Sequence, residues 1–411
     1  MINPKTKERE LCFITKIDAI EPIVGSDNCE AAVVGGWRVM TRKGTFQPGD
    51  LAVYFEIDSK VPETETFEFL AKKHYKIKTQ KYTFGGKGNF ISQGLLMAPE
   101  DFGWEKTIKE DGSPCFVTKD NQLYQEGDFL TQVLGVTYSV LEDNKRKGSG
   151  PDKYKKMAAR HPKIFKQKWA KWLMQREWGK KLMFVFFGKK KDKAGSWPVW
   201  VVKTDEERVQ NLAHMIPDFC KEKWYATEKI DGSSTTFTIK GHGRKEQFLV
   251  CSRNVAFDKP DKKCYYDTNI YTEMAEKYDM YNVLKKLMEA NPDAEFITIQ
   301  GETFGEGVQR RTYGLKEHDF RAFNLIIGTK DGVVKRANPQ AMTDVLALYN
   351  VPCVPIVGLI NLPPTCDEIL AAAAGPSAID GDMREGLVFR SEDGARSFKA
   401  VDNGFLIKFH G

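Results

Sequence analysis

Residues 227–234 combine the side chains that nucleophilic chemistry by an amine would need. They read Thr-Glu-Lys-Ile-Asp-Gly-Ser-Ser, which places Lys229 two residues before Asp231. A lysine amine is a nucleophile only when neutral, and its ordinary pKa is about 10.4, so neighbouring cations, burial or a metal-bound substrate must lower that pKa. Asp231 could hold a metal ion or orient the amine, and Gly232 lets the backbone turn tightly or approach a ligand closely.

The same spacing occurs a second time, so the motif alone decides nothing. Residues 109–113 read Lys-Glu-Asp-Gly-Ser and stand between two predicted strands, where a polar turn is expected. Whatever distinguishes Lys229 from Lys109 must therefore come from residues elsewhere in the chain.

The composition is that of a globular protein. Its 411 residues favour two or three domains, and 41% hydrophobic residues suffice for ordinary cores. No apolar run reaches the roughly 18 residues of a membrane span, and the N-terminus lacks the apolar core of a signal peptide. The eight cysteines are scattered without a Cys-x-x-Cys pair, which argues for a reducing, intracellular compartment and against a disulfide framework or structural zinc site.

Positive charge is concentrated in one segment. Residues 142–193 contain 18 Lys and Arg against 5 Asp and Glu, a local charge of +13 in a chain of +6, so the remainder carries −7. Such a segment suits a nucleic-acid backbone, and it equally suits a solvated connector. Trp169 and Trp172 in its helical pattern either stack on bases or form a packing face, which is the favoured interpretation.

The pattern of apolar runs predicts an α+β protein in three parts. Short runs separated by turns indicate a β-barrel over residues 1–140. An oligonucleotide-binding (OB) barrel fits the length, and a purely structural β-domain fits the pattern nearly as well. Within it, residues 127–136 read as a helix followed by a return strand. Residues 141–195 are expected to be a basic helical linker, and residues 196–411 a second domain of strands and helices.

Polar clusters in the second domain stand beside predicted strands. Residues 203–211 read as a helix capped by Thr204 or Asp205, whose charged residues could face a nucleotide or RNA. Residues 271–288 read as one amphipathic scaffold helix. The other clusters contain Arg253, Glu302, Phe320 with Phe323, Glu385 and Lys399.

Taken in order, these clusters resemble the motifs of the covalent nucleotidyltransferase superfamily, which comprises RNA ligases, DNA ligases and mRNA capping enzymes. Residues 229–232 resemble its nucleophile motif, and the resemblance covers roughly residues 197–411. It implies one role for each further cluster: Arg253 contacts the 5′-phosphate strand or the nucleotide, Glu302 holds the ribose, Phe320 or Phe323 stacks on the base, Glu385 helps to bind metal, and Lys399 contacts the α-phosphate.

The position of the barrel narrows the resemblance. The chain stops soon after Lys399, without the C-terminal OB domain of capping enzymes and many DNA ligases, and its candidate barrel is N-terminal. This arrangement resembles nick-sealing RNA ligases of the Deinococcus and Naegleria type, as do residues 203–206 and 36–50. The basic segment is longer than in that group. Val401 stands where many relatives have a second lysine, and Lys408 is the candidate replacement.

The resemblance implies an ATP-dependent RNA ligase whose C-terminal domain has antiparallel sheets and helices like those of ATP-grasp folds. Its partner would be RNA with 3′-OH and 5′-phosphate ends, expected as a nicked duplex, and the ligase would act as a monomer without membrane association. Magnesium, or manganese in its place, would be held by Asp231, Glu302 and Glu385, since magnesium prefers carboxylate and phosphate oxygens.

The site predicted in this way has overlapping parts. Its catalytic residues are Lys229, Asp231, Glu302, Glu385 and Lys399. Its nucleotide-binding residues are Glu228, Lys229, Arg253, Glu302, Phe320, Phe323, Glu385, Lys399 and Lys408. Three alternatives stay open: a DNA ligase, a GTP-dependent capping-type enzyme, and a non-catalytic RNA-binding protein with a decayed transferase fold.

Overall fold

The computed structural model describes most of the chain outside one long segment. The described residues are 3, 9–86, 88–138, 197–203, 205–257 and 269–410, with parts of 162–183. The chain divides into two compact units, one of residues 1–137 with 195–411 and the other of residues 138–194. None of the described helices is both long enough and apolar enough to cross a membrane.

The smaller unit contains two described helices, α3 (Pro162–Phe165) and α4 (Lys168–Met174). Phe165 and Met183 are buried in a small cluster, whereas Trp169 and Trp172 are about half exposed, at 52% and 49%. The two tryptophans therefore contribute less to packing than the sequence pattern predicts. Most of the predicted linker 141–195 lies outside the described residues.

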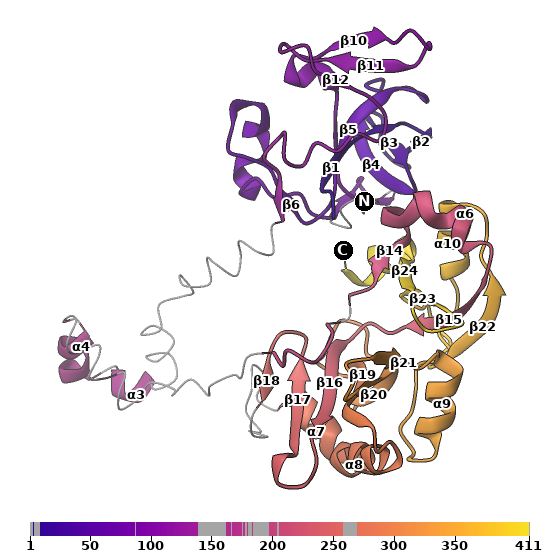
Figure 1. Ribbon diagram of the computed structural model, residues 1–411. Helices are drawn as coiled ribbons and strands as arrows, with labels where there is room; N and C mark the ends of the chain where they lie inside the picture. The colour runs from indigo at the N-terminus through magenta and orange to yellow at the C-terminus, as the bar shows by residue number, and fades with distance from the viewer. Residues whose placement is uncertain are drawn as a thin grey trace. The chain divides into compact units, whose positions relative to one another are not determined.

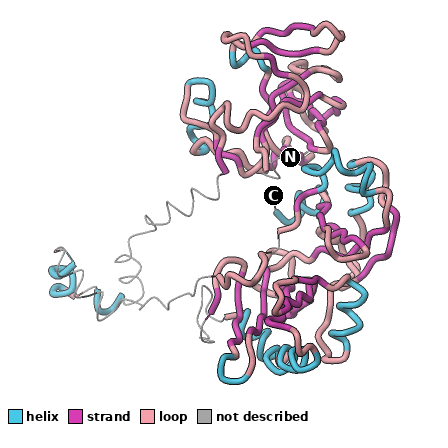
Figure 2. Tube along the Cα trace, viewed as in Figure 1, coloured by secondary structure: helices cyan, strands magenta, loops and turns pink. Residues whose placement is uncertain are grey.

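The N-terminal part of the larger unit is built mainly of short antiparallel strands and loops (Figure 2). The strands pair in the orders β1-β5-β9, β2-β3-β4, β7-β8 and β10-β11-β12, around a core that includes Trp37 and Tyr54. The elements are β1 (Cys12–Lys16), β2 (Ala19–Pro22), β3 (Cys29–Val34), β4 (Trp37–Arg42), β5 (Leu51–Phe55), β6 (Ser59–Lys60), η1 (Glu65–Lys73), β7 (Gln80–Thr83), β8 (Asn89–Ser92), β9 (Leu95–Met97), η2 (Pro99–Phe102), β10 (Glu105–Ile108), β11 (Pro114–Val117), β12 (Leu123–Tyr124) and β13 (Thr137–Tyr138).

The prediction of a helix and return strand at residues 127–136 is wrong. Phe129 forms an isolated antiparallel bridge with Phe13, and the Thr131 hydroxyl accepts a hydrogen bond from the backbone N–H of Leu11 at 2.9 Å. The chain then turns instead of extending. Contacts with a strand more than 100 residues away fix this segment, and no local pattern encodes them.

The C-terminal part of the larger unit contains two sheets (Figure 1). A five-stranded sheet has the order β14-β24-β23-β15-β22, in which only the β14–β24 pair is parallel, and a six-stranded antiparallel sheet has the order β18-β17-β16-β19-β20-β21. Their strands are β14 (Glu207–Arg208), β15 (Lys223–Lys229), β16 (Ser233–Lys240), β17 (Gln247–Ser252), β18 (Ala256–Phe257), β19 (Ala294–Phe304), β20 (Asp319–Thr329), β21 (Val334–Arg336), β22 (Ile356–Asn361), β23 (Gly386–Ser391) and β24 (Ser397–Val401).

Six of the described helices pack apolar side chains against these sheets. Side chains of α7, α8 and α9 pack on the six-stranded sheet, and those of η4, α6 and α10 pack on the five-stranded sheet (Figure 1). The helices are η4 (Val209–Met215), α6 (Ile216–Phe219), η5 (Gly243–Lys245), α7 (Ile270–Lys277), α8 (Met280–Ala290), α9 (Pro339–Ala347), α10 (Cys366–Ala373), α11 (Asn403–Phe405) and η6 (Leu406–His410).

Two helix predictions in this part need correction. The single helix predicted over residues 271–288 is broken between α7 and α8, because Asp279 takes a left-handed conformation with φ 48°. The helix predicted over residues 203–211 begins only at Val209. Glu207 and Arg208 before it are extended as β14, since they pair with Phe398 and Lys399 of β24.

The chain passes directly from one sheet to the other at the predicted nucleophile. Lys229 is the last residue of β15 in the five-stranded sheet, and Ser233 begins β16 of the six-stranded sheet. Residues 230–232 alone join them. The fold therefore places Lys229 where residues from both sheets can reach it.

Candidate active site

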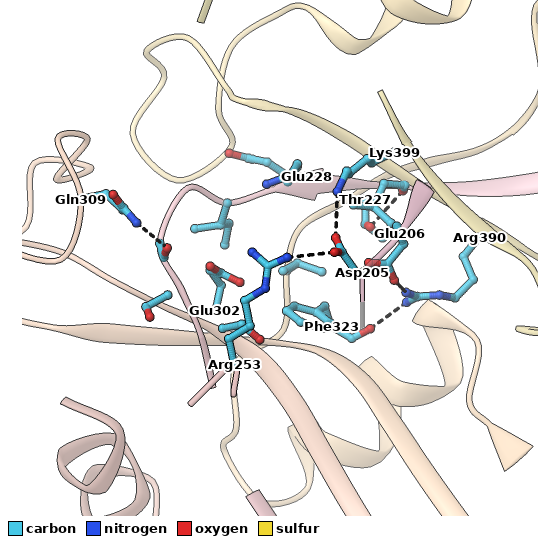
Figure 3. A pocket seen from close by; sticks show the side chains of 17 residues that line it. Asp205, Glu206, Thr227, Glu228, Arg253, Glu302, Gln309, Phe323, Arg390 and Lys399 are labelled. Carbon is cyan, nitrogen blue, oxygen red and sulfur yellow. Dashed lines mark hydrogen bonds and ion pairs between the residues drawn. The ribbon is translucent and has the colours of Figure 1, made fainter. Parts of the chain in front are cut away.

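A cavity of about 300 Å³ surrounds the end of β15, where the two sheets join (Figure 3). Lys229, Glu228, Arg253, Glu302, Phe323 and Lys399 of the predicted site all line it. The other lining residues are Asp205, Glu206, Thr227, Ile230, Gly232, Ser233, Ser234, Gln309, Val354, Val388 and Arg390. The volume is at the lower end of the range typical of small-molecule sites, about 300–1,000 Å³.

Strand register explains why residues far apart in the chain meet here. Gly386 pairs with Lys229, so the preceding residue, Glu385, lies beside the lysine. In the same sheet Thr227 pairs with Val388, which pairs with Lys399. Because side chains alternate along a strand, Thr227 and Lys229 share a face, and Lys399 joins them on it.

Lys229 is held by carboxylates. Its Nζ donates to Glu385 Oε2 at 2.7 Å, and Glu385 is buried, with 8% of its surface exposed. Burial of the amine lowers its pKa, but the negative charges of Glu385, Glu302 and Asp231 outweigh burial, so the pKa of Lys229 is raised. The lysine alone is therefore an ammonium ion at neutral pH, and its activation requires added positive charge.

Glu302 reaches the same place from the six-stranded sheet. It lies on β19, opposite Ser234 of β16. Burial, together with the nearby charges of Glu385 and Asp231, raises the pKa of Glu302 to about 8, although Lys229 and Arg253 act in the opposite direction. Lys229 is therefore surrounded by three carboxylates, those of Glu385, Glu302 and Asp231, of which only Glu302 lines the cavity.

Asp231 and Gly232 are fixed by a loop that sequence reasoning did not assign to the site. The backbone N–H of Asp231 donates to the Tyr313 hydroxyl at 2.7 Å, and Gln309 donates to the Gly232 carbonyl at 3.0 Å. Asp231 is buried and does not line the cavity, so it acts on Lys229 through its charge. Gln309 and Tyr313 follow the predicted strand by several residues, with only their polarity as a signal.

Glu228 turns its carboxylate into the protein beside the cavity. It is 1% exposed, its Oε2 accepts from the backbone N–H of Ala378 at 2.8 Å, and its buried Oε1 has no hydrogen-bond partner among the described residues. A buried carboxylate oxygen without a donor costs free energy. Glu228 lines the cavity as a residue, but its Oε1 is buried, so its carboxylate holds the backbone at Ala378 and is not presented to the cavity.

Of the two candidate aromatic side chains, only Phe323 lines the cavity. The ladder between β19 and β20 shifts register, since Gly301 pairs with Ala322 whereas Gln300 pairs with Asn324. Phe323 is the extra residue of this bulge, and a bulge re-aims its side chain. The ring of Phe320 is fully buried in the core, so Phe323 is the candidate of the two for stacking on a base.

Phe320 instead fixes the strand that carries Glu302. A Cβ added to Gly301 would collide with the Phe320 ring and with the Arg321 carbonyl oxygen. The ring also packs edge-on against Phe237 at 5.3 Å between centroids. Phe320 therefore sets how closely β19 and β20 approach, which positions Glu302, the residue after Gly301.

The predicted phosphate lysines lie in different surroundings. Lys399 lines the cavity, and burial together with the charges of Lys229 and Arg208 lowers its pKa against the effect of Asp205. Lys408 lies outside the lining residues and pairs with Asp382 at 3.0 Å. The prediction that Lys408 completes the phosphate site is therefore not supported by its position.

Three further charged residues belong to the site region. Arg390 is 2% exposed at its side chain and donates to the Phe323 carbonyl at 2.7 Å and to Glu206 at 3.2 Å (Figure 3). Arg208 pairs in the sheet with Lys399, and its guanidinium lies 5.8 Å from the centre of the Trp37 ring. The predicted charged face of residues 203–211 was the only sequence signal for Glu206 and Arg208.

The carboxylates do not form a ready-made metal cage. Among the described residues, no group of three His, Cys, Asp or Glu side chains could hold a metal ion directly. The three carboxylates around Lys229 nevertheless favour binding of a cation there, and an ion bound to them through water molecules fits this arrangement. Magnesium usually binds in this way, because it keeps several of its waters.

Comparison with known proteins identifies two domains. Residues 11–98 match a family model described as an OB-fold domain, and residues 222–408 match one described as RNA ligase. The C-terminal part of the chain is therefore an RNA ligase domain. The order of an OB barrel followed by a ligase domain is confirmed for this ligase, as is the resemblance on which it was predicted.

Solved structures of Naegleria gruberi RNA ligase are similar to this ligase over nearly its whole length. A mutant with AMP and Mn matches at 26% identity and a TM-score of 0.64, covering 98% of this chain and 99% of that one. A mutant with ATP and Mn matches at the same values and is covered to 100%. A structure with PPi matches at 27% identity and 0.63, covering 98% and 99%. A search of curated protein sequences finds no match.

Proposed function

We propose that the ligase uses ATP to form a lysyl-AMP at Lys229 and, as a monomer, joins RNA 3′-OH to 5′-phosphate ends at nicks in a duplex. The position of Lys229 carries the proposal: its amine lies in a cavity, 2.7 Å from Glu385, with Lys399 and Arg253 lining the same cavity. Catalysis of phosphoryl transfer rests mainly on positioning and charge neutralisation, and these residues supply both.

The proposed reaction consists of three phosphoryl transfers. The neutral amine of Lys229 attacks the α-phosphorus, the bond to pyrophosphate breaks with its electron pair on pyrophosphate, and an N–P bond forms. An oxygen of the RNA 5′-phosphate then attacks the AMP phosphorus, which returns the amine and gives a 5′–5′ diphosphate. The RNA 3′-hydroxyl finally attacks the RNA phosphorus, loses its proton, and releases AMP.

Activation of Lys229 depends on its carboxylate neighbours. When bound, magnesium or manganese supplies positive charge near the α-phosphate, and Asp231, Glu302 and Glu385 would hold it through water. Carboxylates that face a cation no longer stabilise the lysine ammonium, so the pKa of Lys229 falls from its raised value. Lys399 adds positive charge from across the sheet.

Relatives solved with nucleotides support ATP over GTP, since similar structures of the Naegleria ligase contain ATP or AMP. Phe323 lines the cavity and offers a ring on which the base can stack.

Two further observations support an RNA substrate. The N-terminal OB-fold match is to a fold that commonly binds oligonucleotides, and the C-terminal match is to RNA ligases. Similar structures of the Naegleria ligase were solved with ATP, PPi and AMP. In the proposed reaction ATP and PPi are the substrate and product of the first transfer, and AMP is released in the third.

Incubation of the full chain with ³²P-α-labelled ATP and Mg²⁺ tests the first step. We expect a labelled protein band, with the AMP mapped by mass spectrometry to the peptide that contains Lys229. Unlabelled ATP should compete for the label far better than GTP. Absence of label would contradict the proposal, and better competition by GTP would indicate a capping-type enzyme.

Nicked duplexes test the substrate. Duplexes whose 3′-OH strand ends in RNA or in DNA, each opposite the same template, would be sealed at different rates by an RNA ligase. We expect faster sealing with the RNA end. Equal sealing of both, or faster sealing of DNA, would contradict the proposed specificity.

A further inference from the structure

One carboxylate that lines the cavity contacts two of its cations, Arg253 and Lys399. Asp205 accepts from Arg253 Nη2 at 2.8 Å through one oxygen and from Lys399 Nζ at 3.1 Å through the other (Figure 3). Among the described residues, Asp205 is the only ion-pair partner of either cation. No part of the mechanism above uses it.

The two cations reach Asp205 from different sheets. Arg253 follows β17 of the six-stranded sheet, and Lys399 lies on β24 of the five-stranded sheet. Asp205 immediately precedes Glu206, whose side chain is held by buried Arg390. The carboxylate is thus anchored by its neighbour and bridges the two sheets across the cavity.

The contacts of Asp205 are of a kind that a phosphate can replace. Its side chain is 58% exposed, and that of Arg253 is 65% exposed, so their pair is weakly held, as exposed ion pairs are. Lys399 and Arg253 lower the pKa of Asp205 against the effect of burial, so it is an anion at neutral pH. A phosphate presents anionic oxygens to the same donors and forms stronger charge-assisted hydrogen bonds.

We propose that Asp205 is a displaceable counter-ion, which holds Arg253 and Lys399 toward the cavity and gives them up to the phosphate oxygens of the nucleotide or of the RNA end. This inference rests on the proposed function, since it assigns the cavity to phosphates. Competition by Asp205 weakens phosphate binding in general, and so it also speeds the departure of pyrophosphate.

Binding of inorganic pyrophosphate to the full chain, measured by calorimetry, tests the inference without catalysis. In Asp205→Asn the competing charge is gone, and we expect the Kd for pyrophosphate to fall roughly three- to tenfold. Asp205→Glu keeps the charge and should bind like the parent. The KM for ATP in Asp205→Asn should fall while pyrophosphate inhibits more strongly.

Asp218→Asn is the matched control. It removes the same charge from an exposed pair with Lys221, 2.7 Å apart, that does not line the cavity, and its Kd should equal the parent's. If Asp205→Asn does not fold, the Kd for pyrophosphate is measured with Asp205→Ser in the same titration.

An unchanged or higher Kd in Asp205→Asn, or in Asp205→Ser where it replaces that variant, would overturn the counter-ion role and indicate a carboxylate that only positions the cations. Labelling of the parent by ATP keeps the two proposals apart. Labelling together with weaker pyrophosphate binding in Asp205→Asn would refute the counter-ion alone. Loss of both labelling and pyrophosphate binding in the parent would refute the assignment of the cavity to phosphates.

Discussion

Lys109 and Lys229 stand in the same four-residue pattern, but one lies in the turn between β10 and β11 and the other at the end of β15. Gly112 of the first copy has φ 82° and open space around it, so glycine there serves the turn. Gly232 of the second copy is needed for a different reason: a Cβ would collide with the Thr303 carbonyl oxygen and lie 2.9 Å from Glu302 Cγ.

The neighbours of the two lysines differ in the same way. The Lys109 amine contacts Gln125, and Asp111 accepts from the Ser113 backbone N–H at 2.9 Å, so the first copy is satisfied by residues close in the chain. Lys229 contacts Glu385, 156 residues away. Reactivity in this pattern is therefore supplied by strands that register brings together, and the four residues provide only the amine.

The largest expected effect separates the two lysines themselves. Lys229→Ala should lower formation of labelled protein by at least about a thousandfold, because the attacking atom is removed, whereas Lys109→Ala should label like the parent. Quantification of bound ³²P after gel electrophoresis measures both. Normal labelling of Lys229→Ala would show that another residue carries the AMP.

The next effect tests whether position in the sheet decides the role of a lysine. Lys399→Ala should slow adenylylation by about a hundredfold, since it removes a positive charge that lines the cavity. Lys408→Ala should have little effect, because that amine pairs with Asp382 outside the lining. Single-turnover rates at saturating ATP measure both, and equal losses would restore Lys408 to the phosphate site.

A pH profile of adenylylation tests the role of Glu385, the carboxylate that pairs with Lys229 and has no counterpart at Lys109. The raised pKa of Lys229 means that the adenylylation rate increases with pH as the amine loses its proton. Glu385→Gln removes an attractive charge, so the pKa falls and the rise should move to lower pH, while the maximal rate also drops. Single-turnover rates between about pH 6 and pH 9.5 show the direction. A shift to higher pH would mean that Glu385 does not stabilise the ammonium.

The smallest effect concerns stability. Burial raises the pKa of Glu302 to about 8, so between its ordinary pKa and pH 8 the unfolded chain releases a proton that the folded chain keeps. Folding stability from this group therefore falls as pH rises through that window. At pH 8 the free energy of unfolding of Glu302→Gln should exceed that of the parent by on the order of 2 kcal/mol, so its melting temperature is higher. At pH 4.5 the two proteins should unfold at nearly the same temperature.

Exposed Glu110 of the first copy provides the control for that measurement. Glu110→Gln should leave the melting temperature unchanged at both pH values. If Glu302→Gln gave no gain at pH 8, Glu302 would be ionised there and paired more favourably than its burial suggests.

Sequence reasoning located the parts of the site that follow from order along strands. Glu228 and Lys229 share one strand, and Glu385 stands directly before the strand that pairs with it. Arg253 and Glu302 likewise lie at the end of β17 and on β19, where alternating apolar runs predict strands. The alternation of apolar and polar residues along a strand suffices to find such residues, because this alternation is a local property of the sequence.

The rest depended on long-range pairing. The sequence left the stacking residue open between Phe320 and Phe323. A bulge of one residue turns Phe323 to the cavity, and a bulge is visible only when the partner strand is known. Residues 207–208 have helical composition, but pairing with β24 extends them. At Asp279 a left-handed turn divides a helix whose apolar spacing continues across it. In each case a tertiary contact overrides a local preference.

The contact between Gly301 and Phe320 limits which substitutions this ligase tolerates at these two positions. Any side chain at position 301 needs space that the Phe320 ring fills, and a smaller residue at 320 alone leaves a hole beneath the strand of Glu302. The two positions must therefore change together, through an intermediate that is less active whichever comes first. Lineages should keep the pair intact for long periods and then replace both, although neither residue touches a phosphate.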